Sequence, residues 1–315
     1  MAIKFIRKNR QIGVNDLFEN ILGNDKIKNE LINSVKQNKY SHSYLFLGTA
    51  GIGKRLIARE FAKMILCEGE EKYCGKCKSC LEFDSNNNPD FFEIEPDGNN
   101  VKIEQIREMQ RKIAEQPIIS KKKVYIINEA DTMTREAQNC LLKTLEEPPE
   151  FANIILIGSN EANFLSTIKS RCTIIKFNNI PDEEIKKYLE QKYELEDVPK
   201  SIILASSGSI GKAEIIKDKQ ELYSAVDEAI NNIEKMDLID TLKKADIIYK
   251  SQEDKNEILE YINIVLFKKA KQNTKYLNCI NIVEDAKKRL KANSNYNMTI
   301  DNMIMTIWEE IHWKI

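Results

Sequence analysis

Glycine is scarce in this sequence, with 11 residues among 315, whereas about 7% is usual in soluble proteins. Gly48, Gly51 and Gly53 nevertheless fall within six positions. Glycine is the residue that lets a backbone turn tightly or approach a ligand closely. Three glycines so close together in a glycine-poor chain indicate one specialised loop.

An excess of either charge is also lacking, because 48 Lys and Arg residues balance 49 Asp and Glu residues and give a net charge of -1. Such a chain has no overall positive field that would attract nucleic acid, so any contact with DNA has to be local or assisted by partner proteins. No stretch reaches the roughly 18 apolar residues of a membrane span, and the first residues lack the apolar core of a signal peptide. We therefore expect a cytoplasmic protein with no membrane contact.

Histidine is rarer still, and the two present, His42 and His312, lie far apart in the sequence. We assign them no catalytic role. The seven cysteines are not expected to form disulfides in a reducing compartment. Four of them fall between residues 67 and 80, and a cluster of this kind suggests a metal.

Short apolar runs bounded by helical patterns dominate the first half of the chain. A strand, the glycine loop and a helix follow one another, and further strands and a helix come after them. The predicted strands are 44–47, 124–127 and 154–157, and the predicted helices are 56–66 and 134–146. Strands that alternate with helices predict a parallel α/β sheet.

Beyond about residue 178 the pattern becomes that of amphipathic helices. Pro181 followed by three acidic residues is typical of a helix N-terminus. We place domain boundaries near residues 179 and 220. The chain is thus divided into an α/β domain over 1–179, a small helical domain over 180–220 and a second helical domain over 221–315.

The glycine loop fits the phosphate-loop pattern G-x-x-x-x-G-K, with Gly48, Gly53 and Lys54 at the defining positions. Its glycines, Gly51 included, let backbone N–H groups face phosphate oxygens, and Lys54 would reach the terminal phosphates. Arg55 stands where a Ser or Thr hydroxyl would bind magnesium, and its cation would repel the metal. The flanking strand and helix favour a true phosphate loop over a chance glycine turn.

The strand at 124–127 should end in an acidic pair, an Asp that organises magnesium and a Glu that orients the attacking water. Asn128-Glu129 occupies this place, so a second metal-organising charge is absent. Glu129 alone is equally well explained as a helix-start carboxylate. We predict that metal-dependent hydrolysis is lost, while nucleotide binding without hydrolysis stays open.

The clustered cysteines Cys67, Cys74, Cys77 and Cys80 have the spacing C-x₆-C-x₂-C-x₂-C. Four thiolates can close a tetrahedral structural zinc site, with no open position for catalysis. An iron–sulfur cluster is the alternative, but no fourth cysteine follows three residues after Cys80. We favour zinc over a cluster or no metal.

Several motifs resemble those of the bacterial DNA polymerase III clamp loader family. They lie at 128–133, 139–149 and 167–172, within a similarity that runs over most of 18–215. The resemblance implies an α/β P-loop AAA+ domain with a parallel sheet and a small helical lid. It also implies an all-helical C-terminal collar domain that assembles five subunits into a ring.

Motor subunits of that family keep a Thr, an Asp-Glu pair and a lid Arg where this chain has Arg55, Asn128 and Gly211. The chain therefore resembles the delta-prime branch, which does not hydrolyse ATP and carries a four-cysteine zinc module. In the Ser170-Arg171-Cys172 motif, the family places an arginine finger that reaches a neighbour's ATP site. The ordinary alternative for an Arg is a surface salt bridge.

The implied partners are motor subunits of the gamma/tau type, the delta-type subunit, the sliding clamp and primer-template DNA inside the ring. The implied cofactor is structural zinc, and ATP binding is left open. The chain would act within the DNA polymerase III holoenzyme without an ATPase activity of its own. Two alternatives are an ATP-hydrolysing motor subunit and a zinc-containing regulator that binds nucleic acid.

Overall fold

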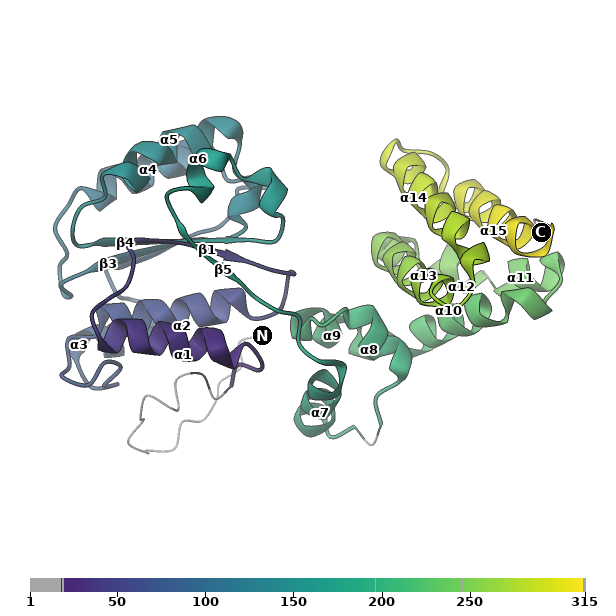
Figure 1. Ribbon diagram of the computed structural model, residues 1–315, viewed down its shortest axis with the longest axis horizontal. Coiled ribbons are helices and arrows are strands. Elements are labelled where there is room, and N and C mark those ends of the chain that lie inside the picture. The colour runs from purple at the N-terminus through teal and green to yellow at the C-terminus, as the bar shows by residue number, and fades with distance from the viewer. Residues whose placement is uncertain (1–17, 19, 196, 245, 314–315) are drawn as a thin grey trace. The chain divides into compact units, whose positions relative to one another are not determined.

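The computed structural model describes residues 18, 20–195, 197–244 and 246–313 (Figure 1). The chain divides into two compact units, Met1–Ile180 and Pro181–Ile315. The predicted first domain begins at residue 1, and its first 17 residues lie outside the described part. The predicted division of the second unit near residue 220 stays a prediction.

The first unit contains a five-stranded sheet in the order β2-β3-β4-β1-β5, in which every neighbouring pair is parallel. The strands are β1 Ser43–Leu47, β2 Phe91–Ile94, β3 Lys123–Ile127, β4 Ala152–Gly158 and β5 Thr173–Lys176. The predicted parallel α/β sheet is confirmed.

The three central strands are buried at every position, which explains why they read in the sequence as unbroken apolar runs. Leu45 of β1 lies opposite Leu156 on one side and Ile174 on the other. The edge strands β2 and β5 are only partly buried or exposed. They were not predicted, because they lack the continuous apolar pattern.

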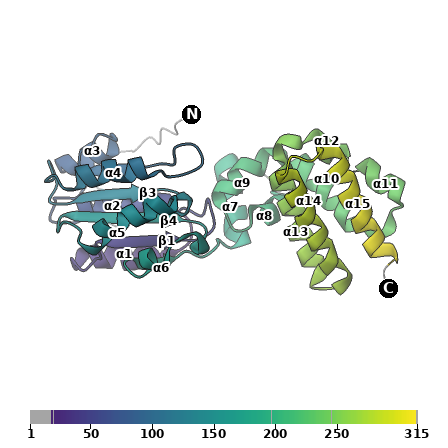
Figure 2. The same cartoon turned by 90° about the horizontal axis from the view of Figure 1, so that it is seen from above.

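Helices cover both faces of this sheet (Figures 1 and 2). One layer consists of α1 Asp25–Lys36, α2 Lys54–Leu66 and α3 Lys78–Asp84. The other consists of α4 Ile103–Ile113, α5 Arg135–Glu146 and α6 Ser166–Lys169, with short 3₁₀ turns at Ala130–Thr132 and Glu161–Asn163. Each layer closes its own apolar core, one around Phe46 and Phe61 and the other around Tyr125 and Leu141.

The described part of the second unit contains helices and no strand, so the predicted all-helical C-terminal part is confirmed. Its α-helices are α7 Asp182–Tyr193, α8 Lys200–Ser206, α9 Ile210–Ile216, α10 Gln220–Asn232, α11 Leu238–Lys244, α12 Asp246–Lys250, α13 Lys255–Ala270, α14 Leu277–Lys291 and α15 Tyr296–Trp313. Short 3₁₀ turns connect several of them, at Lys217–Lys219, Ile233–Lys235, Gln252–Asp254 and Thr274–Tyr276. In the core, the rings of Tyr223 and Tyr261 meet edge to face at 5.1 Å.

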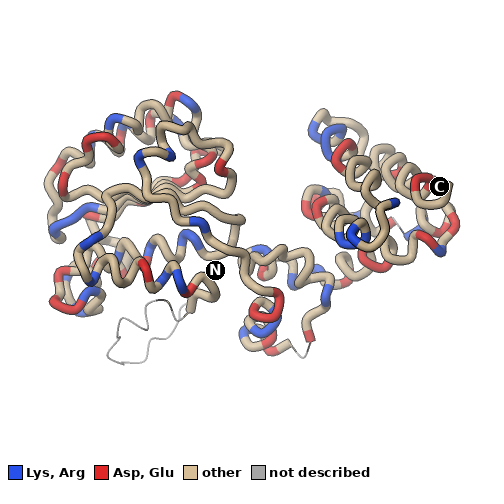
Figure 3. Tube along the Cα trace, viewed as in Figure 1, with Lys and Arg blue, Asp and Glu red and all other residues tan. Residues whose placement is uncertain are grey.

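Basic and acidic positions are interspersed along the helices of both units (Figure 3). This agrees with the near balance of charges in the sequence. None of the described helices is long and apolar enough to cross a membrane.

A buried carboxylate fixes the segment that leads into β3. Asp90, which is completely buried, accepts hydrogen bonds from the backbone N–H groups of Ile118, Ile119 and Ser120, each at 2.7 Å. The Ser120 hydroxyl then donates to the hydroxyl of Ser79 in α3 at 2.9 Å. The start of α3 and the lead into β3 are thereby joined.

Replacing Asp90 by Ala should leave three backbone N–H groups without their acceptor. We expect the substitution to lower the free energy of unfolding of the first unit by about 2–4 kcal/mol. Amide hydrogen exchange should accelerate at residues 118–120, and Glu115→Gln, an exposed change in the same segment, should not accelerate it. Unchanged exchange at 118–120 in the Asp90 variant would contradict this account.

Candidate functional site

The phosphate loop joins β1 to α2 and has the backbone that its glycines predict. Gly53 caps the start of α2 with φ at 94°, a left-handed conformation that favours glycine. Gly51 has φ at 76°. The sequence therefore folds locally as strand, glycine loop and helix, with Lys54 as the first helical residue.

The Lys54 ammonium group is turned into the loop and is buried. It donates to the carbonyl oxygens of Gly48 at 2.5 Å and Thr49 at 2.8 Å. Burial lowers the pKa of Lys54 to about 8, although the charge of Asp131 acts in the opposite direction. The Ser159 hydroxyl, at the end of β4, lies 3.5 Å from the ammonium nitrogen and was not foreseen from the sequence.

Arg55 forms ion pairs with two carboxylates that follow one another along the edge of the sheet. Its Nε donates to Glu93 at 2.7 Å, and a terminal nitrogen contacts Glu95 at 2.5 Å. Arg59, one turn further along α2, holds the other oxygen of Glu93 at 2.5 Å. The guanidinium group that replaces the metal-binding hydroxyl is therefore neutralised within the chain.

Asn128 belongs to the same network. Its side-chain amide donates to the second oxygen of Glu95 at 2.9 Å, so Arg55 and Asn128 share one carboxylate. The two positions that depart from the metal-binding pattern are thus brought together by a residue that the sequence reasoning missed. Glu129 adopts a left-handed conformation with φ at 46°, and its side chain is exposed.

Gly211, the third departure, is the second residue of α9 in the second unit. Glycine has no side chain, so no guanidinium group stands at this position.

Arg171 follows α6 and is held by three groups of its own unit. It forms an ion pair with Glu146, the last residue of α5. Its other terminal nitrogen donates to the Thr167 carbonyl oxygen at 2.9 Å and the Ser170 hydroxyl at 3.2 Å. About a third of the side chain, 32%, is exposed.

Cys172, next in the chain, behaves as a packing residue. Its side chain contacts the core that also contains Leu141 and Ile168. Burial raises the pKa of its thiol to about 12, which keeps it protonated and unreactive.

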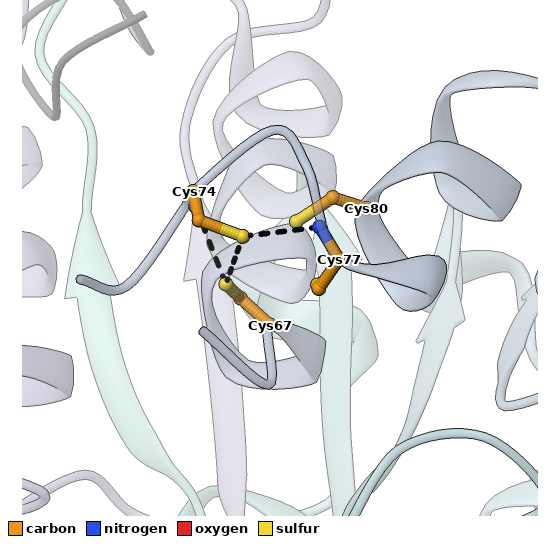
Figure 4. Close-up of side chains that lie close together, drawn as sticks. All are labelled: Cys67, Cys74, Cys77 and Cys80. Carbon is orange, nitrogen blue, oxygen red and sulfur yellow. Dashed lines mark hydrogen bonds between the residues drawn. The ribbon is translucent and has the colours of Figure 1, made fainter. Parts of the chain in front are cut away.

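The four clustered cysteines converge in the structure (Figure 4). In the described chain, the Sγ atoms of Cys67, Cys74, Cys77 and Cys80 all lie within 4.8 Å of one another. The Cys67 and Cys74 sulfur atoms are 3.7 Å apart, close to the about 3.8 Å that tetrahedral coordination with 2.3 Å metal–sulfur bonds requires. These residues can therefore hold a metal ion.

Backbone N–H groups already point at the sulfur atoms. The N–H of Cys74 donates to the Cys67 sulfur, and the N–H of Cys77 donates to the Cys74 sulfur, both at 3.3 Å. The hydrogen bond between Cys80 and Cys67 lowers the pKa of the Cys67 thiol but raises that of the Cys80 thiol, whereas a hydrogen bond from a backbone N–H group carries no such cost. Hydrogen bonds of this kind favour the thiolate form that binds metals.

A buried lysine fixes this cysteine module to the helix of the phosphate loop. Lys63 of α2 is 1% exposed, donates to the Tyr73 hydroxyl at 2.9 Å and pairs with Asp84 in α3. Lys72 donates to the Cys67 carbonyl oxygen at 2.7 Å. The role of Lys63 was missed, because a helical pattern alone gives no partner for a buried charge.

Comparison with known proteins identifies the family to which this chain is similar. A sequence-family model described as "DNA polymerase III, delta subunit" matches residues 23–181. The DNA polymerase III subunit tau/gamma of Haemophilus influenzae is 31% identical over 252 residues, which cover 77% of this chain and 36% of that protein. The DNA polymerase III subunit delta' of Bacillus subtilis is 39% identical over 160 residues, half of this chain and 49% of that protein.

Among solved structures, a DNA polymerase III gamma subunit-related protein from Thermotoga maritima is similar, with a TM-score of 0.50 and 20% identity over 90% of this chain and 100% of that one. At this identity the likeness concerns the fold, and it agrees with the predicted AAA+ architecture. The chain spans about half or less of the length of the two curated relatives above. Because the family model covers about half of the chain, the motif resemblance is confirmed, and the chain belongs to the DNA polymerase III clamp-loader subunits, of the delta-prime type.

Proposed function

We propose that the chain is a non-hydrolysing subunit of a clamp loader, which supplies Arg171 to the ATP site of a neighbouring motor subunit. In this role it helps to load a sliding clamp onto primed DNA. The observation that carries the proposal is the network in which Arg55 and Asn128 share Glu95. A guanidinium group and an amide stand where a magnesium site needs oxygen ligands.

The electrostatics of this network disfavour magnesium. Mg²⁺ requires near-octahedral oxygen ligands, usually carboxylates, waters and phosphates. Of the carboxylates near the loop, those of Glu93 and Glu95 are already engaged by Arg55, and Arg59 takes a further oxygen of Glu93. A metal ion would have to displace these ion pairs and then sit beside a fixed positive charge. This argues against the alternative of an ATP-hydrolysing motor subunit.

Arg171 supports a catalytic contribution in trans. An arginine is always charged, and its planar fork can bind two phosphate oxygens while negative charge shifts during transfer. Fingers of this type raise hydrolysis rates by about 10³–10⁵ in known examples. The relatives' names, tau/gamma and delta', support motor and delta-type subunits as the partners, with the clamp and primer-template DNA as the proposed targets.

The same proposal assigns the helical unit to assembly. We assign residues 180–220 to a lid and 221–315 to a collar that joins the subunits into a ring. The mixed charge of the described helices (Figure 3) offers no strongly basic recognition helix. The alternative of a nucleic-acid-binding regulator is therefore less well supported than the clamp-loader role.

Zinc is the metal that we propose for the four cysteines. Four thiolates with short C-x₂-C gaps form a closed tetrahedral site, in which zinc is structural. The residues fit this role, because Cys67 and Cys80 are buried and backbone N–H groups face two of the sulfur atoms. The site would fasten the segment between α2 and β2.

The isolated chain should not turn over ATP in the presence of magnesium, because Arg55 and Asn128 leave no ligand set for the metal. The measurement is phosphate release from ATP at saturating magnesium, compared with Lys54→Ala as a background control. Turnover that Lys54→Ala abolishes would support the motor alternative and sink the proposed role.

The Arg171→Ala variant should assemble into the reconstituted ring. The DNA-stimulated ATPase rate of this ring should fall by at least the rate that one motor site contributes. The reason is that this site loses the charge which stabilises the transferring phosphoryl group. Size-exclusion chromatography checks assembly, and Arg135→Ala, an exposed arginine at the start of α5, is a matched control. Wild-type turnover in an intact ring would rule out the finger.

Metal analysis of the purified chain should give one zinc per chain. Cys77→Ser should reduce the zinc content and the thermal stability of the first unit, because one of four ligands is lost. Cys140→Ser, outside the cluster, should keep its zinc. An iron signal together with visible absorbance would instead identify an iron–sulfur cluster.

A further inference from the structure

Both terminal nitrogens of the Arg171 guanidinium group contact groups of its own unit. The Glu146 carboxylate holds one terminal nitrogen, and the Thr167 carbonyl and Ser170 hydroxyl oxygens hold the other. The Ser170 hydroxyl is itself fixed, because it donates to the same Thr167 carbonyl at 3.1 Å. Groups from two different helices, α5 and α6, therefore define the orientation of this side chain.

These contacts leave part of the binding capacity of Arg171 unused. An arginine side chain has five N–H donors. Three are directed at Glu146, Thr167 and Ser170. Within the described parts of the chain, the Nε–H and one N–H of the nitrogen that contacts Glu146 remain without a hydrogen-bond partner, and both lie on one planar group. Two donors are enough for a bidentate contact with phosphate oxygens.

The place of Glu146 is unusual for a carboxylate. It is the last residue of α5, where the negative end of the helix dipole disfavours an acidic side chain and favours a basic one. The helix itself is well fixed, because Thr134 caps its start and Leu141 and Leu145 are buried in the core. The positive charge of Arg171 offsets the negative charge of Glu146 and the negative end of the α5 dipole. Because α5 is well fixed, it holds the Glu146 carboxylate in place.

We propose that Glu146 is a positioning residue for Arg171. Its carboxylate holds the guanidinium group in one orientation, with two N–H donors ready for the phosphate of a neighbouring subunit's nucleotide. This inference rests on the proposed role of Arg171 in trans. Its basis is the ion pair at the end of α5, and it gives Glu146 no contact with the nucleotide.

The neighbouring residue provides a matched control. Glu147 follows Glu146 directly, carries the same charge and is exposed. Among the described residues, the carboxylate that pairs with Arg171 is that of Glu146. A change at Glu147 removes the same charge from the surface but leaves the contact with Arg171 in place.

The test is the DNA-stimulated ATPase of the reconstituted ring with Glu146→Ala, Glu146→Gln, Glu147→Gln, Arg171→Ala and the double variant Glu146→Ala/Arg171→Ala. We expect Glu146→Ala to slow the affected site about three- to fivefold, as for loss of a partly exposed ion pair. The loss of ring ATPase rate in Glu146→Ala should then be about two thirds or more of the loss in Arg171→Ala. Glu146→Gln should lose less, because its amide oxygen still accepts a hydrogen bond, and Glu147→Gln should match the wild type.

The double variant distinguishes positioning from a general structural effect. If Glu146 acts through Arg171, the double variant has the rate of Arg171→Ala alone, and the loss lies in kcat with KM for ATP unchanged. A wild-type or higher rate for Glu146→Ala, or a further loss in the Arg171→Ala background, would overturn the inference. An unchanged rate for Arg171→Ala itself would instead overturn the proposed function.

Discussion

The ion pairs between Arg55 and the carboxylates of Glu93 and Glu95 decide what the phosphate loop can do. They join the first turn of α2 to the end of β2. Lys54 is likewise engaged, since it bonds to the carbonyl oxygens of its own loop. Contacts within the chain therefore engage both basic residues at the start of α2.

The two arginines of the first unit show how environment separates residues of the same type. Arg55 forms ion pairs with two carboxylates, those of Glu93 and Glu95, so its charge is neutralised within its own chain. Arg171 pairs with one carboxylate and keeps two donors. In the proposed function, Arg55 with its two carboxylate partners stabilises the fold, while Arg171 with one carboxylate partner acts on a neighbouring subunit.

The sequence predicted the parts of the fold that depend on local pattern. The central strands are continuous apolar runs, and the loop, the cysteines and Arg171 lie in short motifs. The edge strand Phe91–Ile94 was missed because it is half-buried and carries a charged residue. The partners Glu93, Glu95 and Glu146 were missed for a different reason: each is at least 25 residues from the arginine that it binds, so the pairing follows from topology. Lys63 resembles any helical lysine until α3 folds over it.

The shared carboxylate Glu95 also makes the present state of the loop hard to reverse during evolution. Restoring a hydroxyl residue at position 55 by itself would remove a cation from between Glu93 and Glu95 and leave Glu95 with the neutral Asn128. Restoring an acid at position 128 by itself would place a third negative charge beside them. Each single substitution is electrostatically unfavourable, so Arg55 and Asn128 constrain one another through Glu95.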